Sequence, residues 1–452
     1  MKTYGADRDT IIDGLRSGKI SIAVYGLGRM GLPLASLFAD SGARVIGVDV
    51  DPDIVLTINR GDCPVAGEPL LAELVRKSVK AGRLSATSDS VAAAKEADVM
   101  IIVVPMTISP GYAPELSKVK SICEKIAQGL EKGDLVIQEH DVPPRTTNEI
   151  ILPTLEESGL KRGEFGVARC PLHARYGSVI EDIRGSYRKV VGGIDGASTR
   201  AAAALYSAIN STGVITVSNP TAAEALKMFA SVYKDVNIAL ANEFAMTSDE
   251  LGISATEVFG ALNTPPAYVH MSMPGCGVGG HCIGVCGYGL ASAVHSTTRL
   301  HALAREINSG MPDYAVERLQ LALSQAGVEL KGASVLVLGV TYRGDVKDTL
   351  NSPSIPIIAI LTEKSSEVYA YDPLLGEEVR QYGARVVKDL SDVGKEFPID
   401  AVLIASDHSE FKEIDWSDLG ARMRHRVLVD GRQCVNVEEM RDNGWIAYGI
   451  GR

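Results

Sequence analysis

The sequence predicts an α/β protein in which a long helical segment separates two α/β domains. Three observations carry this prediction. Short apolar runs alternate with helical patterns over about the first 215 residues, and apolar residues then recur every three or four positions from Asn219 onward. Strand-like apolar runs return after residue 325. We therefore expect three parts, at residues 1–215, 216–325 and 326–452.

The first part opens with a strand, a turn into a helix and a second strand, which together make one right-handed βαβ unit. The three segments are ISIAVYGL (20–27), RMGLPLASLFADSG (29–42) and ARVIGVDV (43–50). Further strand candidates follow at ADVMIIVVP (97–105), GDLVIQEH (133–140) and FGVARCP (165–171). This alternation is typical of a parallel sheet covered by helices.

The central part is predicted to be an all-α segment. Its first helical stretch runs from Asn219 to Gly252, which is longer than an ordinary helix, and a second runs from Leu290 to about Gln325. The last part is a smaller α/β domain with four strand candidates, at ASVLVLGVTY (333–342), SEVYAYDP (366–373), IDAVLIASDH (399–408) and HRVLVDG (425–431).

Composition limits the possible functions. The net charge of −11 argues against a protein that binds nucleic acid electrostatically. No apolar run approaches the ~20 residues that span a bilayer, and the N-terminus lacks the apolar core of a signal peptide. Seven scattered cysteines fit reduced thiols better than a disulfide framework. We therefore expect a cytoplasmic protein that binds neither nucleic acid nor membranes.

The first strand-turn-helix carries a dinucleotide-binding pattern. Gly26, Gly28 and Gly31 form G-x-G-x-x-G, and Asp49 ends the next strand. These glycines permit a tight turn, close approach of the backbone to a pyrophosphate and close helix packing, while the carboxylate binds ribose hydroxyls. Asp49 favours NAD over NADP, although Arg29 and Arg44 leave NADP open.

A second informative segment is MPGCGVGGHCIGVC (273–286), which places Cys282 among glycines. A cationic or amide-rich setting lowers a thiol pKa and makes a nucleophile. The alternatives are a buried, inert cysteine and a metal site. Cys276, His281, Cys282 and Cys286 are possible ligands, but the C-x2-C spacing of a structural zinc site is missing, so we expect no metal.

Successive blocks of the chain resemble the UDP-glucose/GDP-mannose dehydrogenase family. They are GLGRMGLPLASLFADSG, INRGDCPVAGEP, TAAEALKMFASVYKDVNIALANE, GVGGHCI, LGVTYRGDVKDTLNSPS and VLVDGRQ. GGHC is similar to the branch that acts on UDP-N-acetylhexosamines, such as UDP-N-acetylmannosamine. The resemblance implies two Rossmann-like domains joined by a long helix that also builds a homodimer or higher oligomer, NAD as cofactor and a UDP-sugar as substrate.

The resemblance also implies roles for particular residues in a four-electron oxidation of a sugar CH2OH to a carboxylate. Cys282 would hold the substrate as a thiohemiacetal and then a thioester, and Lys227 would stabilise negative charge on oxygen, with Glu224 one turn earlier holding it or forming a surface pair. The expected cofactor-binding residues are Gly26, Gly28, Arg29, Met30, Gly31, Asp49, Pro105 and Glu139. The expected substrate-binding residues are Gly279, Gly280, His281, Ser231, Arg343, Lys347 and Arg432.

Several positions depart from the family pattern. Cys286 stands where a carboxylate is expected, and Ser231 where an asparagine is expected. The other departures are Leu172 and His173 for Glu and Arg, His140 and Asp141 for Ser and Thr, and Leu350 for a substrate-contacting arginine.

Two interpretations of these departures compete. In the first, the site is rewired, and Asp141, His140 and His173 supply acid/base groups from another wall, with Asp141 and His173 as catalytic residues beside Cys282 and Lys227. In the second, the protein performs a single two-electron oxidation or only binds NAD and a nucleotide sugar. We favour rewiring. A 3-hydroxyacid or 6-phosphogluconate type of dehydrogenase would need neither GVGGHC nor the last domain.

Overall fold

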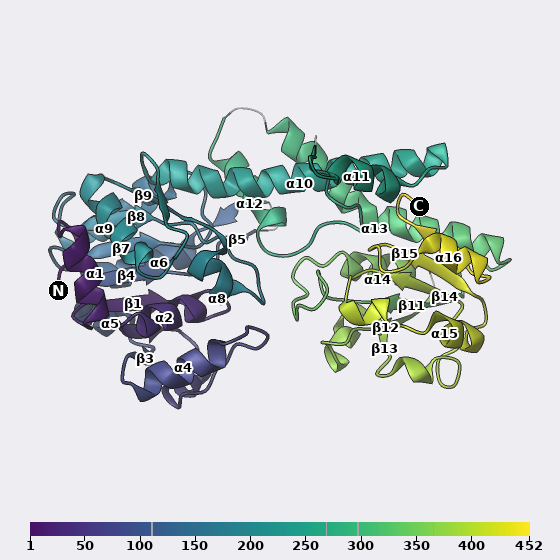
Figure 1. Cartoon of the computed structure of the whole chain (residues 1–452), viewed down its shortest axis with the longest axis horizontal. Helices are drawn as coiled ribbons and strands as arrows, with labels where there is room; N and C mark the ends of the chain where they lie inside the picture. The colour runs from purple at the N-terminus through teal and green to yellow at the C-terminus, as the bar shows by residue number, and fades with distance from the viewer. Residues whose placement is uncertain (110–111, 268, 296–297, 365) are drawn as a thin grey trace. The chain divides into compact units, whose positions relative to one another are not determined.

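The computed structural model describes residues 1–109, 112–267, 269–295, 298–364 and 366–452. The chain folds into two compact units. The first unit is Met1–Ala230 with Val285–Ser296, and the second is Ser231–Gly284 with Thr297–Arg452. Each unit is built on its own sheet of mostly parallel strands, as Figure 1 shows. The division into three sequence parts stays a prediction.

The first unit contains an eight-stranded sheet in the order β10-β9-β8-β7-β4-β1-β2-β3. Neighbouring strands are parallel except for the antiparallel pair β8 and β9. The strands are β1 Ser21–Tyr25, β2 Arg44–Val48, β3 Leu84–Thr87, β4 Val99–Ile102, β7 Leu135–Gln138, β8 Gly166–Arg169, β9 Lys189–Gly193 and β10 Val214–Thr216, with a separate hairpin of β5 Thr107–Ile108 and β6 Pro114–Glu115.

Helices cover both faces of this sheet, because its central strands are apolar on both sides and must be buried on both. One face packs against α1 Arg8–Arg16, α2 Gly31–Asp40, α4 Leu71–Lys80, α8 Val179–Glu181 and α9 Gly196–Ser207. The other face packs against α5 Ser90–Glu96, α6 Ser117–Ala127 and α7 Leu152–Leu155. The helix α3 Pro52–Asn59 follows β2, and the single turns η1 Thr147–Ile151, η2 Glu156–Ser158 and η3 Asp182–Ser186 lie in connections.

The longest helix is α10, Pro220–Leu251, which begins in the first unit and ends in the second. The predicted helical stretch from Asn219 to Gly252 is therefore confirmed. The remaining central helices are α11 Ala255–Asn263, α12 Ile283–Ser292 and α13 Arg299–Gln325. Of the helices in the described part of the chain, none is long and apolar enough to cross a lipid bilayer.

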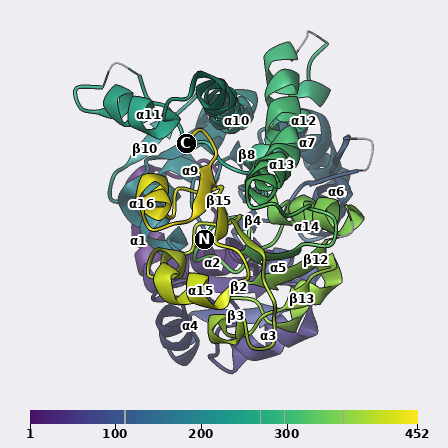
Figure 2. The same ribbon diagram turned by 90° about the vertical axis from the view of Figure 1, so that its right-hand side faces the viewer.

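The second unit contains a six-stranded parallel sheet in the order β13-β12-β11-β14-β15-β16. Its strands are β11 Ser334–Leu338, β12 Glu367–Tyr371, β13 Arg385–Val386, β14 Ala401–Ile404, β15 Val427–Asp430 and β16 Ile446–Gly449. Figure 2 shows α13 and α14 (Ser354–Glu363) on one side of this sheet, and α15 (Trp416–Arg422) and α16 (Val437–Asp442) on the other. Short turns η4 Glu377–Tyr382, η5 Leu390–Asp392 and η6 Ser409–Lys412 complete the unit.

Both sheets place the first strand of the unit beside the fourth of its main strands, which is the strand order of the dinucleotide-binding fold. The turns after β1 and β11 are also alike. Gly26 N–H donates to Val48 O and Gly339 N–H to Tyr371 O, both at 2.8 Å. The predicted architecture of two Rossmann-like domains and a long central helix is thus confirmed. The strands β3, β5, β6, β9, β10, β13 and β16 were not predicted.

Candidate active site

The first unit contains a cavity of about 640 Å³ at the carboxyl ends of β1, β2 and β4. This is the point where the strand order reverses, and it is where doubly wound sheets bind ligands. Four of the residues predicted to bind the cofactor line the cavity, namely Gly26, Gly28, Asp49 and Pro105. Ser117, Lys118, Ser121, Ile122 and Lys125 of α6 form another wall.

The three glycines of the G-x-G-x-x-G motif have different surroundings. A Cβ on Gly31 would lie 1.8 Å from the Gly26 carbonyl oxygen, and one on Gly26, where φ is +97°, would lie 2.6 Å from Val103 O. These two positions need glycine for the turn and the helix packing. Around Gly28 a Cβ would meet nothing within 4 Å. The backbone there faces open space, which fits close approach by a pyrophosphate.

Asp49 links the end of β2 to the glycine turn. Its Oδ2 accepts a hydrogen bond from Leu27 N–H at 2.8 Å, and its Oδ1 accepts one from Asp51 N–H at 3.1 Å. The carboxylate lines the cavity, and each oxygen has a second lone pair available for a ribose hydroxyl. The residues present therefore fit a bound dinucleotide.

The other predicted cofactor residues, Arg29, Met30, Gly31 and Glu139, are not among those that line this cavity. The Arg29 guanidinium stacks over the Tyr176 ring at 5.0 Å, and Met30 packs against the core beside α2. Gly31 is the first residue of α2. Glu139 is fully buried, 2.6 Å from the Lys189 ammonium, and accepts a hydrogen bond from the Tyr206 hydroxyl. The Glu139 carboxylate therefore balances a buried cation in the core.

A buried polar cluster forms where β7 and β8 end and α10 passes. Asp141 is 4% exposed, and its Oδ1 lies 3.8 Å from both Lys227 Nζ and Arg169 Nη2. The thiol of Cys286 donates to Asp141 Oδ2 at 3.5 Å. Lys227 Nζ also donates to the Leu172 carbonyl oxygen at 3.0 Å. The structure thus brings Asp141 and Lys227 together, with Cys286 touching the carboxylate.

Glu224 and His140 were expected to act together with this cluster, but both side chains hydrogen-bond to nearby backbone groups. Glu224 was expected to hold Lys227 or to form a surface ion pair with it. It is instead buried, and its carboxylate accepts hydrogen bonds from Arg145 N–H, Thr147 N–H and the Thr147 hydroxyl at 2.6–2.8 Å. Burial raises the Glu224 pKa in spite of these bonds. His140 accepts a hydrogen bond at Nδ1 from Asp141 N–H at 2.9 Å, which orients the loop after β7.

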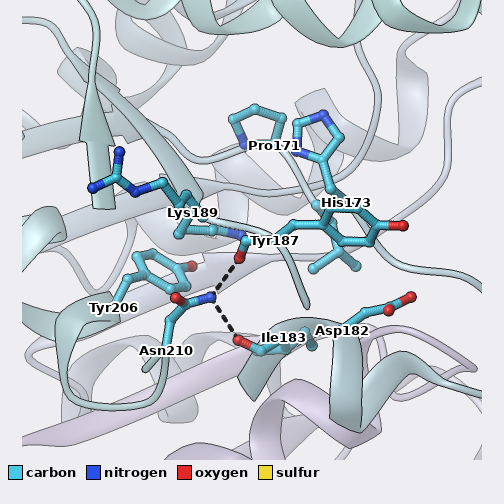
Figure 3. A pocket seen from close by; sticks show the side chains of 10 residues that line it. Pro171, His173, Asp182, Ile183, Tyr187, Lys189, Tyr206 and Asn210 are labelled. Atoms are coloured by element: carbon cyan, nitrogen blue, oxygen red, sulfur yellow. Dashed lines mark hydrogen bonds between the residues drawn. The ribbon is translucent and has the colours of Figure 1, made fainter. Parts of the chain in front are cut away.

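His173 lines a small cavity together with Lys189, Tyr206 and Asn210 (Figure 3). Burial, followed by the charges of Lys227 and Lys189, lowers the pKa of His173 to about 4. The imidazole is therefore uncharged at neutral pH, where it can act as a general base and not as a general acid. Asn210 closes this cavity by donating to the carbonyls of Ile183 and Tyr187, both at 2.8 Å.

In the second unit, the GVGGHC loop packs against the turn that follows β11. A Cβ on Gly279 would lie 2.6 Å from Tyr342 Cβ, and Gly280 adopts a φ of +82° with its N–H donating to Leu350 O at 2.8 Å. The Asn351 side chain donates to Gly280 O at 3.0 Å. The loop therefore has a fixed shape, which ends at His281 and the half-buried Cys282, directly before α12. A thiol at the start of a helix has its thiolate form favoured by the helix dipole.

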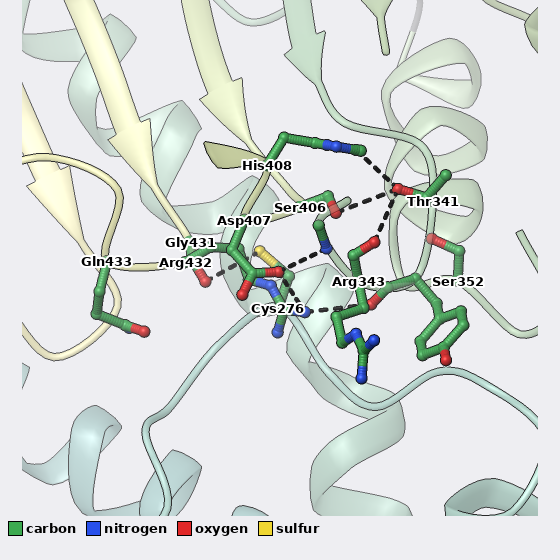
Figure 4. Close-up of polar contacts among 12 residues, drawn as sticks. Cys276, Thr341, Arg343, Ser352, Ser406, Asp407, His408, Gly431, Arg432 and Gln433 are labelled. Carbon is green, nitrogen blue, oxygen red and sulfur yellow. Dashed lines mark hydrogen bonds and ion pairs between the residues drawn. The ribbon is translucent and has the colours of Figure 1, made fainter. Parts of the chain in front are cut away.

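The carboxyl ends of β11, β14 and β15 carry the polar network of Figure 4. The buried imidazole of His408 lies 2.8 Å from the Thr341 hydroxyl, and Asp345 N–H donates to its Nδ1 at 3.0 Å. Asp407 accepts from Gly344 N–H at 2.8 Å and lies 3.7 Å from Arg432. These contacts hold the loop that carries Arg343, at the strand-order reversal of the second sheet.

Three further residues were predicted to bind the substrate, namely Arg432, Lys347 and Ser231. Arg432 donates to Tyr342 O at 3.2 Å, so part of its guanidinium holds the same loop. Lys347 forms an exposed ion pair with Glu378 at 3.4 Å. Ser231 is 5% exposed and follows Lys227 by one turn of α10.

Two groups of the site were missed from the sequence. Arg169 is fully buried at the end of β8, where it is the only cation in the run FGVARCP. That interruption of an apolar strand was the signal that could have found it. Asp407 and His408 form a polar pair shortly after the apolar strand β14, which ends at Ile404, and this is the same kind of signal.

Comparison with known proteins gives consistent matches along the chain. Models of the UDP-glucose/GDP-mannose dehydrogenase family match over the NAD binding domain (residues 20–210), the central domain (221–310) and the UDP binding domain (336–437). A UDP-N-acetyl-D-mannosamine dehydrogenase of Pyrococcus horikoshii is 35% identical, over 95% of this chain and 99% of the relative. An NDP-N-acetyl-D-galactosaminuronic acid dehydrogenase of Ralstonia nicotianae is 31% identical, over 91% and 95%.

The solved structure of the UDP-D-ManNAc dehydrogenase of Pyrococcus horikoshii superposes with a TM-score of 0.87 at 33% identity, covering 96% of this chain and 99% of that one. A dinucleotide site in one α/β domain, combined with a second α/β domain for a nucleotide, defines an NAD-dependent nucleotide-sugar dehydrogenase. The chain belongs to the UDP-glucose/GDP-mannose dehydrogenase family.

Proposed function

We propose that this dehydrogenase oxidises the C6 hydroxymethyl group of a UDP-N-acetylhexosamine to the uronate, with UDP-N-acetylmannosamine as the first candidate. The observation that carries the proposal is Cys282, a half-buried thiol at the start of α12 in a loop of fixed shape. The names of the relatives, which act on N-acetylated mannosamine and galactosamine derivatives, support the substrate class.

When bound, NAD would supply the hydride acceptor for two successive oxidations of the substrate. Between these steps the Cys282 thiolate adds to the C6 aldehyde, forming a C–S bond and a thiohemiacetal, which the second oxidation converts to a thioester. Water then breaks the C–S bond, giving the carboxylate and the thiol. The turn of Gly26, Gly28 and Gly31 and the carboxylate of Asp49 bind the dinucleotide in this proposal.

Lys227 and Asp141 are the proposed catalytic residues of the first unit. The Lys227 ammonium stabilises negative charge on the substrate oxygen. Asp141, which contacts the thiol of Cys286 at 3.5 Å, replaces the carboxylate that family members carry at the position of Cys286 and assists the hydrolytic water. His173, neutral at neutral pH, is the second proposed proton acceptor.

The residues proposed to bind the nucleotide sugar belong to the second unit. Arg343 is proposed to bind the diphosphate, since a guanidinium matches phosphate oxygens in a bidentate manner. Lys347 and Arg432 add positive charge around the same loop. Gly279, Gly280, His281 and Ser231 are proposed to contact the sugar.

A second candidate function is a single two-electron oxidation that stops before the thioester. The observation that favours it is the buried thiol of Cys286, which cannot replace the carboxylate expected at that position in activating water.

We also propose that the protein is a homodimer or higher homo-oligomer that assembles through α10. Phe229, Tyr233, Leu240, Phe244 and Leu251 are spaced by 4, 7, 4 and 7 residues, and each is at least 39% exposed. This spacing forms one apolar stripe along the helix, as at helix–helix interfaces. We further propose a cytoplasmic location, since Cys63, Cys123, Cys170, Cys276 and Cys434 form no disulfide bonds.

The test is the yield of NADH per nucleotide sugar consumed, for UDP-N-acetylmannosamine, UDP-N-acetylglucosamine, UDP-glucose and GDP-mannose. The proposal expects two NADH per UDP-N-acetylhexosamine, lost in Cys282→Ala and retained in Cys63→Ala, the matched control in which another half-buried thiol is removed. One NADH with Cys282 dispensable would favour the single oxidation. No NADH with any sugar would contradict both functions.

A further inference from the structure

The first unit buries six charged side chains where β7 and β8 end and α10 passes. All six are at most 9% exposed, namely Arg169, Lys189, Lys227, Glu139, Asp141 and Glu224. Burying a charge is costly unless an opposite charge or hydrogen bonds compensate it. The distances between these side chains therefore show which charges compensate one another.

Lys189, Glu139 and Glu224 have their charges compensated by partners outside the Asp141 cluster. Lys189 and Glu139 are 2.6 Å apart, and Glu224 accepts hydrogen bonds from two backbone amides and the Thr147 hydroxyl. The other three, Arg169, Asp141 and Lys227, form one group, in which a single carboxylate lies 3.8 Å from each of two cations. This group carries one net positive charge.

Arg169 has an unusual environment for a buried arginine. Its side chain is 0% exposed, and Nη1 donates to the Gln138 carbonyl oxygen at 3.1 Å. Among the described residues, Nε and Nη2 of Arg169 have no hydrogen-bond acceptor. A leucine or methionine would fill this place in the core without that cost. The charge of Arg169 therefore needs an explanation other than packing.

Asp141 supplies the explanation. A buried carboxylate tends to take up a proton, and two cations at 3.8 Å oppose this. If Lys227 were the only cation, Asp141 would cancel its charge, and Lys227 could not stabilise an oxyanion effectively. Arg169 adds a second cation beside this carboxylate, so two cations and one carboxylate lie together in the group.

We propose that Arg169 is a positioning residue that keeps Asp141 ionised and leaves the positive charge of Lys227 available to the substrate. In this proposal the charge of Arg169 compensates the charge of Asp141, and each residue contributes to catalysis only when the other is present. This inference rests on the proposed catalytic role of Asp141. Other titratable groups of the first unit near Asp141 include His140, whose Nδ1 accepts from Asp141 N–H, Cys286 on α12 and His173 after β8.

The experiment uses the full-length protein with NAD and UDP-N-acetylmannosamine, and measures kcat/KM against pH for Arg169→Gln, Arg169→Lys and Asp141→Asn. The matched control is Arg162→Gln, which removes another arginine of the first unit that donates to a backbone carbonyl. Arg169→Gln is expected to move the acidic limb of the profile upward by about one pH unit or more, because loss of a neighbouring cation raises a carboxylate pKa. Arg169→Lys is expected to restore the limb.

A second comparison keeps the inference testable if Arg169→Gln folds poorly. The double variant Asp141→Asn with Arg169→Gln is expected to be no less active than Asp141→Asn alone, since Arg169 acts only through the carboxylate. An unmoved acidic limb in Arg169→Gln, with Asp141→Asn inactive, would overturn this inference alone. Full activity of Asp141→Asn would instead overturn the catalytic role proposed for Asp141.

Discussion

The lowered pKa of His173 predicts a specific pH dependence of stability. An unfolded histidine titrates near its usual pKa of 6.5, whereas the folded pKa is about 4, chiefly because of burial. Between these values the unfolded state binds the proton and the folded state does not. The histidine therefore has no effect on stability above about pH 6.5, and it increasingly favours unfolding as the pH falls toward 4.

The size of the effect follows from the two pKa values. One pKa unit corresponds to about 1.4 kcal/mol, so this separation favours unfolding by about 2 kcal/mol at pH 5 and by about 3 kcal/mol below pH 4. We expect His173→Gln, which cannot take up this proton, to remove the effect. The wild type should therefore lose about 2 kcal/mol relative to the variant between pH 7.5 and 5.

The assay is urea unfolding of both proteins across this pH range, with the difference in unfolding free energy plotted against pH. Asp134→Asn is a control of opposite sign. Burial outweighs the nearby Lys2 ammonium and raises the Asp134 pKa to about 6, so the wild type should lose stability relative to that variant as the pH rises. The reasoning would be refuted if the difference in unfolding free energy between the wild type and His173→Gln did not change from pH 7.5 to 5.

Two further predictions test the cofactor site and the assembly. Gly31→Ala is expected to abolish stabilisation by NAD in thermal unfolding, because its Cβ would lie 1.8 Å from Gly26 O and would displace the turn; a midpoint that still rises with NAD would contradict this. Phe244→Glu, at a 42% exposed position of the α10 stripe, is expected to shift the protein to monomers in analytical ultracentrifugation, whereas Leu321→Glu, at a 44% exposed position on α13, is expected not to. An unchanged sedimentation coefficient in Phe244→Glu would remove α10 as the interface.

Local sequence was sufficient for the long apolar strands, the long central helix and the glycine turn of the cofactor site. Strands such as 97–105 and 399–408 are continuous apolar runs, because parallel strands are buried on both faces. The short edge strands β10 and β13 were missed because they have few residues and mixed polarity. The turn of Gly26 and Gly31 was predictable, because the steric need for glycine arises within one strand-turn-helix unit.

The polar cluster around Asp141 depended on the order of strands in the sheet. Asp141, Arg169 and Lys227 are 28 and 58 residues apart in the chain, and they meet because β7 and β8 are neighbours and α10 crosses their ends. The same arrangement decides which carboxylate serves which cation. Glu139 was expected at the cofactor and instead pairs with Lys189, since side chains of successive residues after a strand point in different directions.

By itself, the sequence determined the two α/β domains, the long helix, the NAD-binding turn and the family to which the chain belongs, because each of these depends on residues that are close together in the chain. The tertiary structure alone decided which buried charges are partners and that His173 is neutral. Burial and charge pairing depend on distances between strand ends, and those distances exist only once the sheet has formed.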